Sequence, residues 1–388
     1  MLPFSPDELR DFIQKNEHTR PADIILRVKA EDREKTKSLI EQMDARKRLA
    51  DKVPEWAERF DLFLPPASNL AQASNTETAE YKAQDVIGRL LDLTAGSGID
   101  GWKMGGKADT FTAVDPNSEL AKRTSYNLQT LGIPHEFHIC TAEEFVASCT
   151  EKYDWIYLDP SRKTEGGSKA VALHRMLPDV PSIWKQIHEI ATHVKMKLSP
   201  LFDLRVIELE LPYVYKIEVL AKKGEVKEIV TTSSKTNSTD LSITAAELAH
   251  GREWSYTAKR SDLGEKPEQA KSWGKYLYDP SAALNKAGLS DHYAYKHGLC
   301  RVMNNVPLYT HSELLPAYPG RIFEIIETGK PFKLKNLPKR LSIVTRNYFD
   351  KPEMIRKRLK AGESDDDFLF AVSENRKNAV FIYATKVV

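Results

Sequence analysis

The sequence predicts an α/β protein in which a largely parallel sheet carries helices on both faces. Short apolar runs alternate with helical patterns from Asp85 to about His250. The first of these runs ends in a glycine-rich turn, residues 94–101, that opens a helix. The chain of 388 residues exceeds the usual size of one hydrophobic core. We therefore expect a helical N-terminal region and a small α+β C-terminal domain beside the sheet.

The composition is that of a soluble globular protein, with 41% apolar and 29% charged residues. The 57 Lys plus Arg nearly balance the 55 Asp plus Glu, so the global charge indicates no particular partner. No apolar run reaches membrane-spanning length and the N-terminus does not resemble a signal peptide, so we expect a cytoplasmic protein without membrane association. Cys140, Cys149 and Cys300 lack metal-ligand spacing, which argues against a metal site and a disulfide framework.

The glycine-rich turn follows the apolar run that ends at Asp92. Gly96, Gly98 and Gly101 fit the pattern G-x-G-x-x-G, which dinucleotide-binding folds share with class I methyltransferases. Charge separates the two: Asp100 falls in the first helical turn, where its carboxylate would repel a pyrophosphate. Asp92 and Asp100 would instead attract the ammonium and sulfonium of S-adenosylmethionine, which has no phosphate.

A second apolar run, Phe111 to Val114, ends in Asp115, 23 residues beyond Asp92. An acidic side chain at such a strand end can accept hydrogen bonds from both hydroxyls of a ribose. Asp115 or Asn117 could equally cap the helix that follows.

Two more strands with polar exits follow. Phe137 to Cys140 precedes Thr141-Ala-Glu-Glu144, which has the form of a capping box. Trp155 to Leu158 precedes Asp159-Pro-Ser-Arg162. Between the N-terminal helices and the first strand, Gln72, Ser74 and Lys82 are candidates for contact with a cofactor, with a helix cap at Ser74 or Asn75 as the alternative.

Four segments occur in a fixed order: the glycine-rich turn after Asp92, the strand end at Asp115, the segment from Thr141, and Asp159-Pro-Ser-Arg162. They resemble motifs I to IV of the class I S-adenosylmethionine-dependent methyltransferases, in particular of a bacterial group with a C-terminal THUMP-like domain. The resemblance covers about residues 60 to 250 and implies a Rossmann-like seven-stranded sheet. By position it assigns the methionine moiety to Asp92 and the glycine turn, the ribose to Asp115, and the adenine to the segment after the third strand. It implies these cofactor-binding residues: Asp92, Thr94, Ala95, Gly96, Gly98, Asp100, Asp115, Thr141, Ala142 and Asp159.

The fourth motif suggests the chemistry. Asp159 can accept a hydrogen bond from an amino or ring N–H, and Arg162 could hold a phosphate or a base edge; we expect both to be catalytic. Ser161 and Arg162 replace the second proline and the aromatic residue of amino-methylating enzymes. The motif also resembles that of uridine C5 methyltransferases, which need a nucleophilic cysteine. No cysteine directly follows the predicted fifth strand, 193–200, so the covalent route is disfavoured.

The predicted organisation has four parts. Residues 1–60 form a helical region with helices at 7–16, 22–29 and 33–48, and residues 61–265 form the methyltransferase domain. An antiparallel hairpin, 213–221 with 226–232, forms the edge of its sheet. Residues 273–320 form a small ferredoxin-like linker domain, and residues 321–388 form the THUMP-like α+β domain.

The last 58 residues carry 13 basic against 7 acidic side chains, a balance of +6, with Tyr348 and Phe349 interleaved. This composition favours RNA binding, although residues 356–360 could form an ordinary solvated helix face. We therefore expect methylation of a nucleobase nitrogen in structured RNA, rRNA or tRNA. The alternatives are a catalytically reduced RNA-binding or scaffold protein that keeps the fold and, less favoured, a small-molecule methyltransferase.

Overall fold

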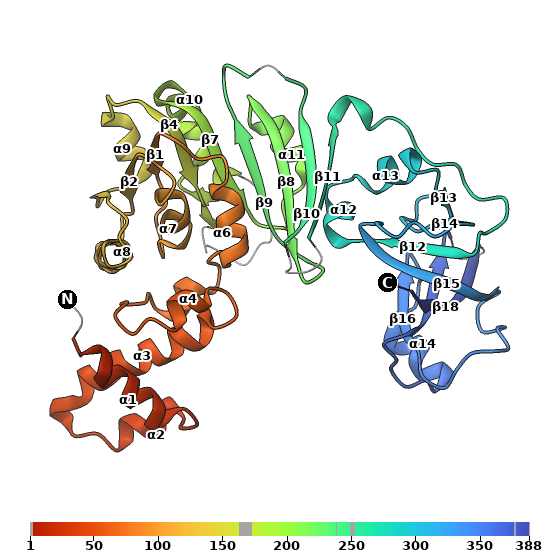
Figure 1. Cartoon of the computed structure of the whole chain (residues 1–388), viewed down its shortest axis with the longest axis horizontal. Coiled ribbons are helices and arrows are strands. Elements are labelled where there is room, and N and C mark those ends of the chain that lie inside the picture. The colour runs from red at the N-terminus through yellow and green to blue at the C-terminus, as the bar shows by residue number, and fades with distance from the viewer. Residues whose placement is uncertain (1–2, 163–172, 238, 249–252, 376–377, 388) are drawn as a thin grey trace. The chain divides into compact units, whose positions relative to one another are not determined.

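The computed structural model describes residues 3–162, 173–237, 239–248, 253–375 and 378–387. The chain divides into two compact units, Met1–Tyr215 with Ile229–Ser238, and Lys216–Glu228 with Thr239–Val388. Figure 1 follows the chain through both units. In the described residues, no helix is long and apolar enough to cross a membrane.

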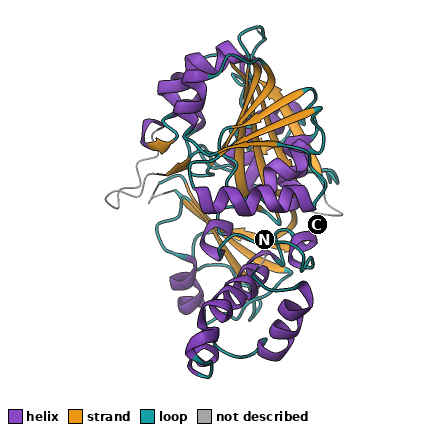
Figure 2. Cartoon of the chain, turned by 90° about the vertical axis from the view of Figure 1, so that its left-hand side faces the viewer, coloured by secondary structure: helices purple, strands orange, loops and turns teal. Residues whose placement is uncertain are grey.

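The N-terminal region is helical, as predicted (Figure 2). Ser5 caps the first helix by accepting a hydrogen bond from the backbone N–H of Glu8, and prolines occupy the first turn of three of these helices. The third and longest helix buries Leu39, Met43 and Leu49. The elements are α1 (Pro6–Asn16), α2 (Pro21–Leu26), η1 (Ala30–Asp32), α3 (Arg33–Leu49), α4 (Pro54–Ala57), α5 (Ala67–Leu70) and α6 (Thr76–Ala83).

The central sheet has nine strands in the order β11-β10-β8-β9-β7-β4-β1-β2-β3. The stretch from β3 through β4 to β7 is parallel, and β9 runs antiparallel to β7. The strands are β1 (Arg89–Asp92), β2 (Thr110–Val114), β3 (Glu136–His138), β4 (Tyr153–Leu158), β7 (Ala191–Leu198), β8 (Val214–Lys222), β9 (Glu225–Ser233), β10 (Ser242–Glu247) and β11 (Trp254–Lys259).

The expectation of seven strands, with the hairpin β8–β9 at the edge, is wrong in one respect. β10 pairs with β8 in parallel, and β11 covers β10 in antiparallel register, so the sheet continues for two strands beyond the hairpin. β10 has the sequence Ser-Ile-Thr-Ala-Ala-Glu, whose alanines and glutamate are weak strand formers. Its last five residues are nevertheless buried, so tertiary packing determines this strand.

Helices connect the parallel strands, and Leu90, Phe111, Leu128 and Trp155 share one apolar core cluster with residues of these connections. A small antiparallel pair follows β4. The connecting elements are α7 (Ile99–Gly105), α8 (Ser118–Thr130), α9 (Ala142–Ser148), β5 (Ser161–Arg162), η2 (Leu173–Arg175), β6 (Met176–Leu177), α10 (Val180–Ile190) and α11 (Leu204–Glu210).

The second sheet has seven strands in the order β13-β14-β12-β15-β18-β17-β16, and its pairs are antiparallel except β16 with β17. Its strands are β12 (Tyr276–Pro280), β13 (Cys300–Arg301), β14 (Tyr309–His311), β15 (Gly320–Gly329), β16 (Ser342–Arg346), β17 (Asp367–Ser373) and β18 (Ala379–Lys386). The accompanying helices are η3 (Arg260–Asp262), α12 (Ala282–Lys286), α13 (Ser290–Lys296) and α14 (Pro352–Leu359).

This sheet corrects the predicted boundary between residues 320 and 321. β15 pairs with β12 on one side and with β18 on the other. Leu277 and Val302, from the predicted linker domain, share a core cluster with Phe323, Phe370 and Ile382. Because one long strand and one core serve both segments, they are parts of a single mostly antiparallel domain.

Candidate functional site

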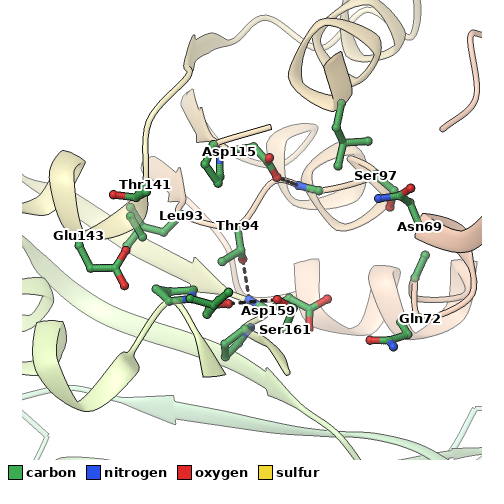
Figure 3. A pocket seen from close by; sticks show the side chains of 18 of the residues that line it. Asn69, Gln72, Leu93, Thr94, Ser97, Asp115, Thr141, Glu143, Asp159 and Ser161 are labelled. Atoms are coloured by element: carbon green, nitrogen blue, oxygen red, sulfur yellow. Dashed lines mark hydrogen bonds between the residues drawn. The ribbon is translucent and has the colours of Figure 1, made fainter. Parts of the chain in front are cut away.

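The described part of the first unit contains a pocket of about 570 Å³ at the carboxyl ends of the parallel strands. Figure 3 shows its side chains, which come mainly from the segments after β1, β2, β3 and β4 and from the N-terminal region. Six of the predicted site residues line it: Thr94, Gly96, Asp115, Thr141, Ala142 and Asp159. The other wall residues are Ser68, Asn69, Gln72, Ala73, Leu93, Ser97, Pro116, Leu120, Glu143, Pro160, Ser161, Leu177 and Pro178.

The glycine turn is fixed against helix α8. Gly96 and Gly98 have φ angles of 50° and 81°, in the left-handed region that favours glycine. The carbonyl of Gly96 accepts a hydrogen bond from Thr124 Oγ1 at 2.6 Å, and a Cβ on Gly98 would lie 2.6 Å from Thr124 Cγ2. Ala95 is buried behind this turn. Ala95 and Gly98 shape the turn, while the wall itself includes Gly96.

Asp115 joins the glycine turn to the exit of β2. One carboxylate oxygen accepts from the backbone N–H of Gly96 at 2.9 Å (Figure 3). The other accepts from the backbone N–H of Asn117 at 2.8 Å. The side chain of Asn117 caps α8. Burial raises the pKa of Asp115. The capping role thus belongs to Asn117, and Asp115 is positioned at the pocket.

The segment after β3 forms the predicted capping box. Thr141 Oγ1 accepts from the backbone N–H of Glu144, whose carboxylate accepts from the backbone N–H of Thr141 at 2.9 Å. The neighbouring Glu143 accepts from the backbone N–H of Asp179 at 3.0 Å and lines the pocket. In the sequence, Glu143 stands out only as a member of the capping-box segment 141–144.

Asp159 is held by its backbone and by its side chain. Its backbone N–H donates to Thr94 Oγ1 at 2.6 Å (Figure 3). Its Oδ2 accepts from Lys197 Nζ at 2.5 Å. Burial raises the pKa of Asp159, and the charge of Lys197 opposes that rise. Arg162 has its backbone in β5, but its side chain lies outside the described part of the structure.

Asp100 lies behind the pocket wall rather than in it. Its carboxylate forms an ion pair with Lys82 at 2.9 Å and accepts hydrogen bonds from Ser74 Oγ at 2.9 Å and Tyr157 Oη at 2.8 Å. Burial alone would raise the pKa of Asp100, but the charges of Lys82 and Lys197 outweigh it and lower the pKa. The charge of Asp100 is therefore compensated inside the protein.

Asp92 is also absent from the wall, with an exposed fraction of 1%. Its Oδ1 accepts from the backbone N–H of Thr94 at 2.9 Å. Burial, together with the charges of Asp100, Asp159 and Asp115, raises the pKa of Asp92 to about 8. Together, Asp92 and Asp100 do not supply the net negative charge that the sequence argument assumed.

Sequence reasoning did not identify most of the wall that α5 and the loop after it contribute. Lys52 Nζ holds this loop by donating to the carbonyls of Leu70, Ala71 and Ala73 at 3.1, 2.6 and 3.2 Å. Of the three candidates from this segment, Gln72 lines the pocket, whereas Ser74 and Lys82 bind Asp100. The expected alternative, a cap, is present at Asn75.

No protein-family profile matches the chain. An uncharacterized S-adenosylmethionine-dependent methyltransferase from Mycobacterium tuberculosis is 24% identical over 333 residues, covering 83% of this chain and 88% of the relative. A crystal structure of a candidate methyltransferase from Porphyromonas gingivalis W83 is 27% identical, with a TM-score of 0.87 over 100% of both chains. The chain is thus S-adenosylmethionine-dependent methyltransferase-like in sequence and fold, and S-adenosylmethionine is the cofactor that this likeness assigns to it.

Proposed function

We propose that this protein is an S-adenosylmethionine-dependent methyltransferase that acts on a nucleobase nitrogen of structured RNA, rRNA or tRNA. One observation carries the proposal: the carboxylate of Asp159 lines the same pocket as the glycine turn and Asp115. A cofactor seated on the turn and a base beside Asp159 would share one cavity, whose 570 Å³ is in the range of small-molecule sites.

The residues present suit the cofactor. The left-handed turn at Gly96 and Gly98 allows close approach of a ligand to the backbone, and Asp115 can accept from ribose hydroxyls. S-adenosylmethionine supplies a methyl group made electrophilic by its sulfonium. Asp159 accepts a hydrogen bond from the substrate N–H, which orients the nitrogen lone pair and stabilises the positive charge that develops on methylation.

The RNA part of the proposal rests on the surface of the second unit. Arg346 and Arg356 are paired with Asp279 and Glu363 at 2.6 and 2.9 Å, so they contribute little free charge. Phe349 is 53% exposed, as an aromatic platform for a base requires. Among the described residues of 331–388, the exposed basic side chains are Lys333, Lys335, Lys339, Arg340, Lys351, Lys357, Arg358, Lys360 and Lys386. We propose that this domain delivers RNA in a THUMP-like role.

Calorimetry tests the cofactor assignment. The purified protein should bind S-adenosylmethionine, and Asp115→Ala should lower the affinity roughly ten- to a hundredfold, because a charged hydrogen bond contributes about 1 to 3 kcal/mol. Glu119→Ala is the matched control, since this acid lies exposed on α8 and pairs with Lys122. An unchanged affinity in Asp115→Ala would contradict the ribose-binding role.

Methyl transfer to RNA tests the reaction. Total RNA from a strain that lacks the gene should accept labelled methyl groups from S-adenosylmethionine, and mass spectrometry of its nucleosides identifies the modified base. Asp159→Asn should slow single-turnover transfer by roughly two to four orders of magnitude. Cys140→Ala and Cys149→Ala should leave the rate nearly unchanged. Cofactor and RNA binding without transfer would support the scaffold alternative, and a covalent adduct with 5-fluoropyrimidine RNA would indicate carbon methylation.

A further inference from the structure

A buried lysine lies behind the proposed catalytic acid. Lys197, near the end of β7, has an exposed fraction of 8%. Its ammonium donates to Asp159 Oδ2 at 2.5 Å and to the backbone carbonyl of Gln72 at 3.2 Å. Buried lysines are rare because desolvation of the ammonium is costly, and they persist when partners compensate the charge. Lys197 thus connects the exit of β4 with the wall that the N-terminal region contributes.

We infer that Lys197 is a positioning residue of the methyl-transfer site: it holds Asp159 Oδ2 and the wall at Gln72, so that Asp159 Oδ1 accepts one N–H of the substrate. This inference rests on the proposed function. It keeps the substrate of that proposal, because the acceptor requires a nitrogen that carries hydrogen, either an exocyclic amino group or a ring N–H.

The geometry gives Asp159 two anchors. The backbone N–H of Asp159 donates to Thr94 Oγ1 at 2.6 Å and so fixes the main chain. Lys197 fixes one carboxylate oxygen. The carboxylate still reaches the pocket, since its side chain is 34% exposed. Such anchoring removes rotational freedom before the substrate arrives, which favours reaction from the bound state.

Lys197 also helps to keep Asp159 ionised. In the part of the chain that the structure describes, four charged or titratable side chains influence Asp159: Lys197 from β7, Lys82 from α6, Asp100 from α7 and Asp92 from β1. Burial raises the pKa of Asp159, and Lys197 makes the largest contribution that lowers it. Without Lys197 the carboxyl group would become neutral at a higher pH, and a neutral carboxyl group is a weaker acceptor.

The test compares the affinities of the full-length protein for S-adenosylmethionine and S-adenosylhomocysteine by calorimetry across a pH series. S-adenosylhomocysteine lacks the sulfonium charge, so the ratio of the two affinities reports the negative charge beside the sulfonium. In the wild type the preference for S-adenosylmethionine should fall as the pH falls through the pKa of Asp159. Lys197→Met should move the midpoint of this fall upwards by roughly 1 to 3 pH units, and Lys197→Arg should restore it.

A double-mutant comparison assigns the effect to Asp159. Asp159→Asn should remove the part of the pH dependence that Asp159 contributes, and adding Lys197→Met to it should produce no further shift. Lys195→Met is the matched control, because Lys195 lies two residues earlier on β7, is 2% exposed and binds the carboxylate of Asp85. It should leave the midpoint unchanged. If Lys197→Met does not fold, as circular dichroism would reveal, Lys197→Gln should give the upward shift instead.

Two failures are distinguishable. An unshifted midpoint in the folded Lys197 variants, or an equal shift in Lys195→Met, would overturn the role of Lys197 while cofactor binding stands. If the wild type binds neither nucleoside at millimolar concentration, the proposed function fails and the role of Lys197 fails with it.

Discussion

Asp92 shows how a single residue acquires its charge state from its surroundings. In sequence it is the acid before the glycine turn, and its expected role was attraction of a cation. In the structure it is buried among three other acids, and its pKa is raised to about 8. A neutral Asp92 can still accept the hydrogen bond from the backbone N–H of Thr94. We therefore assign it a structural role in holding the start of the turn.

This charge state predicts a dependence of stability on pH. The folded pKa is about 8, whereas the unfolded value is about 3.9. Between these values the folded state binds one more proton than the unfolded state, so stability falls by about 1.4 kcal/mol per pH unit as the pH rises. Asp92→Asn, which keeps an acceptor oxygen, should remove this contribution.

Denaturant titration of the cofactor-free protein at pH 6.0 and 7.5 measures the effect. The wild type should lose about 2 kcal/mol more than Asp92→Asn over this interval. The exposed Asp109→Asn serves as the control and should follow the wild type. Equal losses in the wild type and Asp92→Asn would show that Asp92 is ionised in the folded protein.

At the scale of elements, the turn between β1 and α7 depends on α8. Thr124 of α8 is fully buried, and its hydroxyl donates to the carbonyl of Gly96. Its methyl group occupies the space that a Cβ on Gly98 would need. The turn is therefore constrained both by its backbone conformation and by packing, which maintains the shape of the pocket floor.

Gly98→Ala and Gly132→Ala separate these two constraints. Both glycines have left-handed backbones, with φ of 81° and 76°, but a Cβ at Gly132 would meet no atom within 4 Å. Both variants should lose about 1 to 2 kcal/mol for the backbone conformation. Gly98→Ala should lose about 1 to 3 kcal/mol more, because Thr124 cannot move without breaking its hydrogen bond.

Urea denaturation measures both losses, and calorimetry with S-adenosylmethionine should show weakened binding for Gly98→Ala alone. Similar stabilities of the two variants would mean that the contact with Thr124 relaxes at little cost.

At the scale of the whole molecule, the near-neutral total charge conceals a basic C-terminal segment. Much of its arginine charge is paired within the protein: Arg346 binds the buried Asp279 at 2.6 Å and Arg356 binds Glu363 at 2.9 Å. Arg358 lies over the ring of Phe332. Lysines provide much of the charge that stays exposed. If this surface binds RNA, its affinity should depend strongly on salt.

The triple variant Lys339→Gln, Lys357→Gln, Lys360→Gln tests this surface. Fluorescently labelled tRNA should bind the wild type with an affinity that falls as salt rises, and the variant should show a slope in log Kd against log salt smaller by about 2. The control replaces three exposed lysines of the N-terminal region, Lys15, Lys29 and Lys37, by glutamine. An equal change in slope for both triples would indicate nonspecific attraction.

The sequence by itself was sufficient to predict the structural features that depend on residues close together in the chain. The three main N-terminal helices, the five parallel strands, the capping box at Thr141 and the position of Asp115 all follow from residues close together in the chain. Alternation of apolar residues and capping chemistry act over a few residues, so their patterns are readable without tertiary contacts. The order of the motifs likewise placed six of the predicted residues in the pocket wall.

Only the tertiary structure determined the charge states of the carboxylates at the site and the part of the pocket wall that α5 and the following loop contribute. Lys82 forms an ion pair with Asp100, which lies 18 residues later in the sequence, and Lys197 forms one with Asp159, which lies 38 residues earlier. The weak strand β10 forms because β8 and β11 flank it, and β15 joins two segments that sequence patterns separated. Burial and pairing between distant residues determine whether a carboxylate is charged, and no local spacing encodes them. Hence the sequence located the site, whereas long-range contacts determine which of its acids are ionised and which face the pocket.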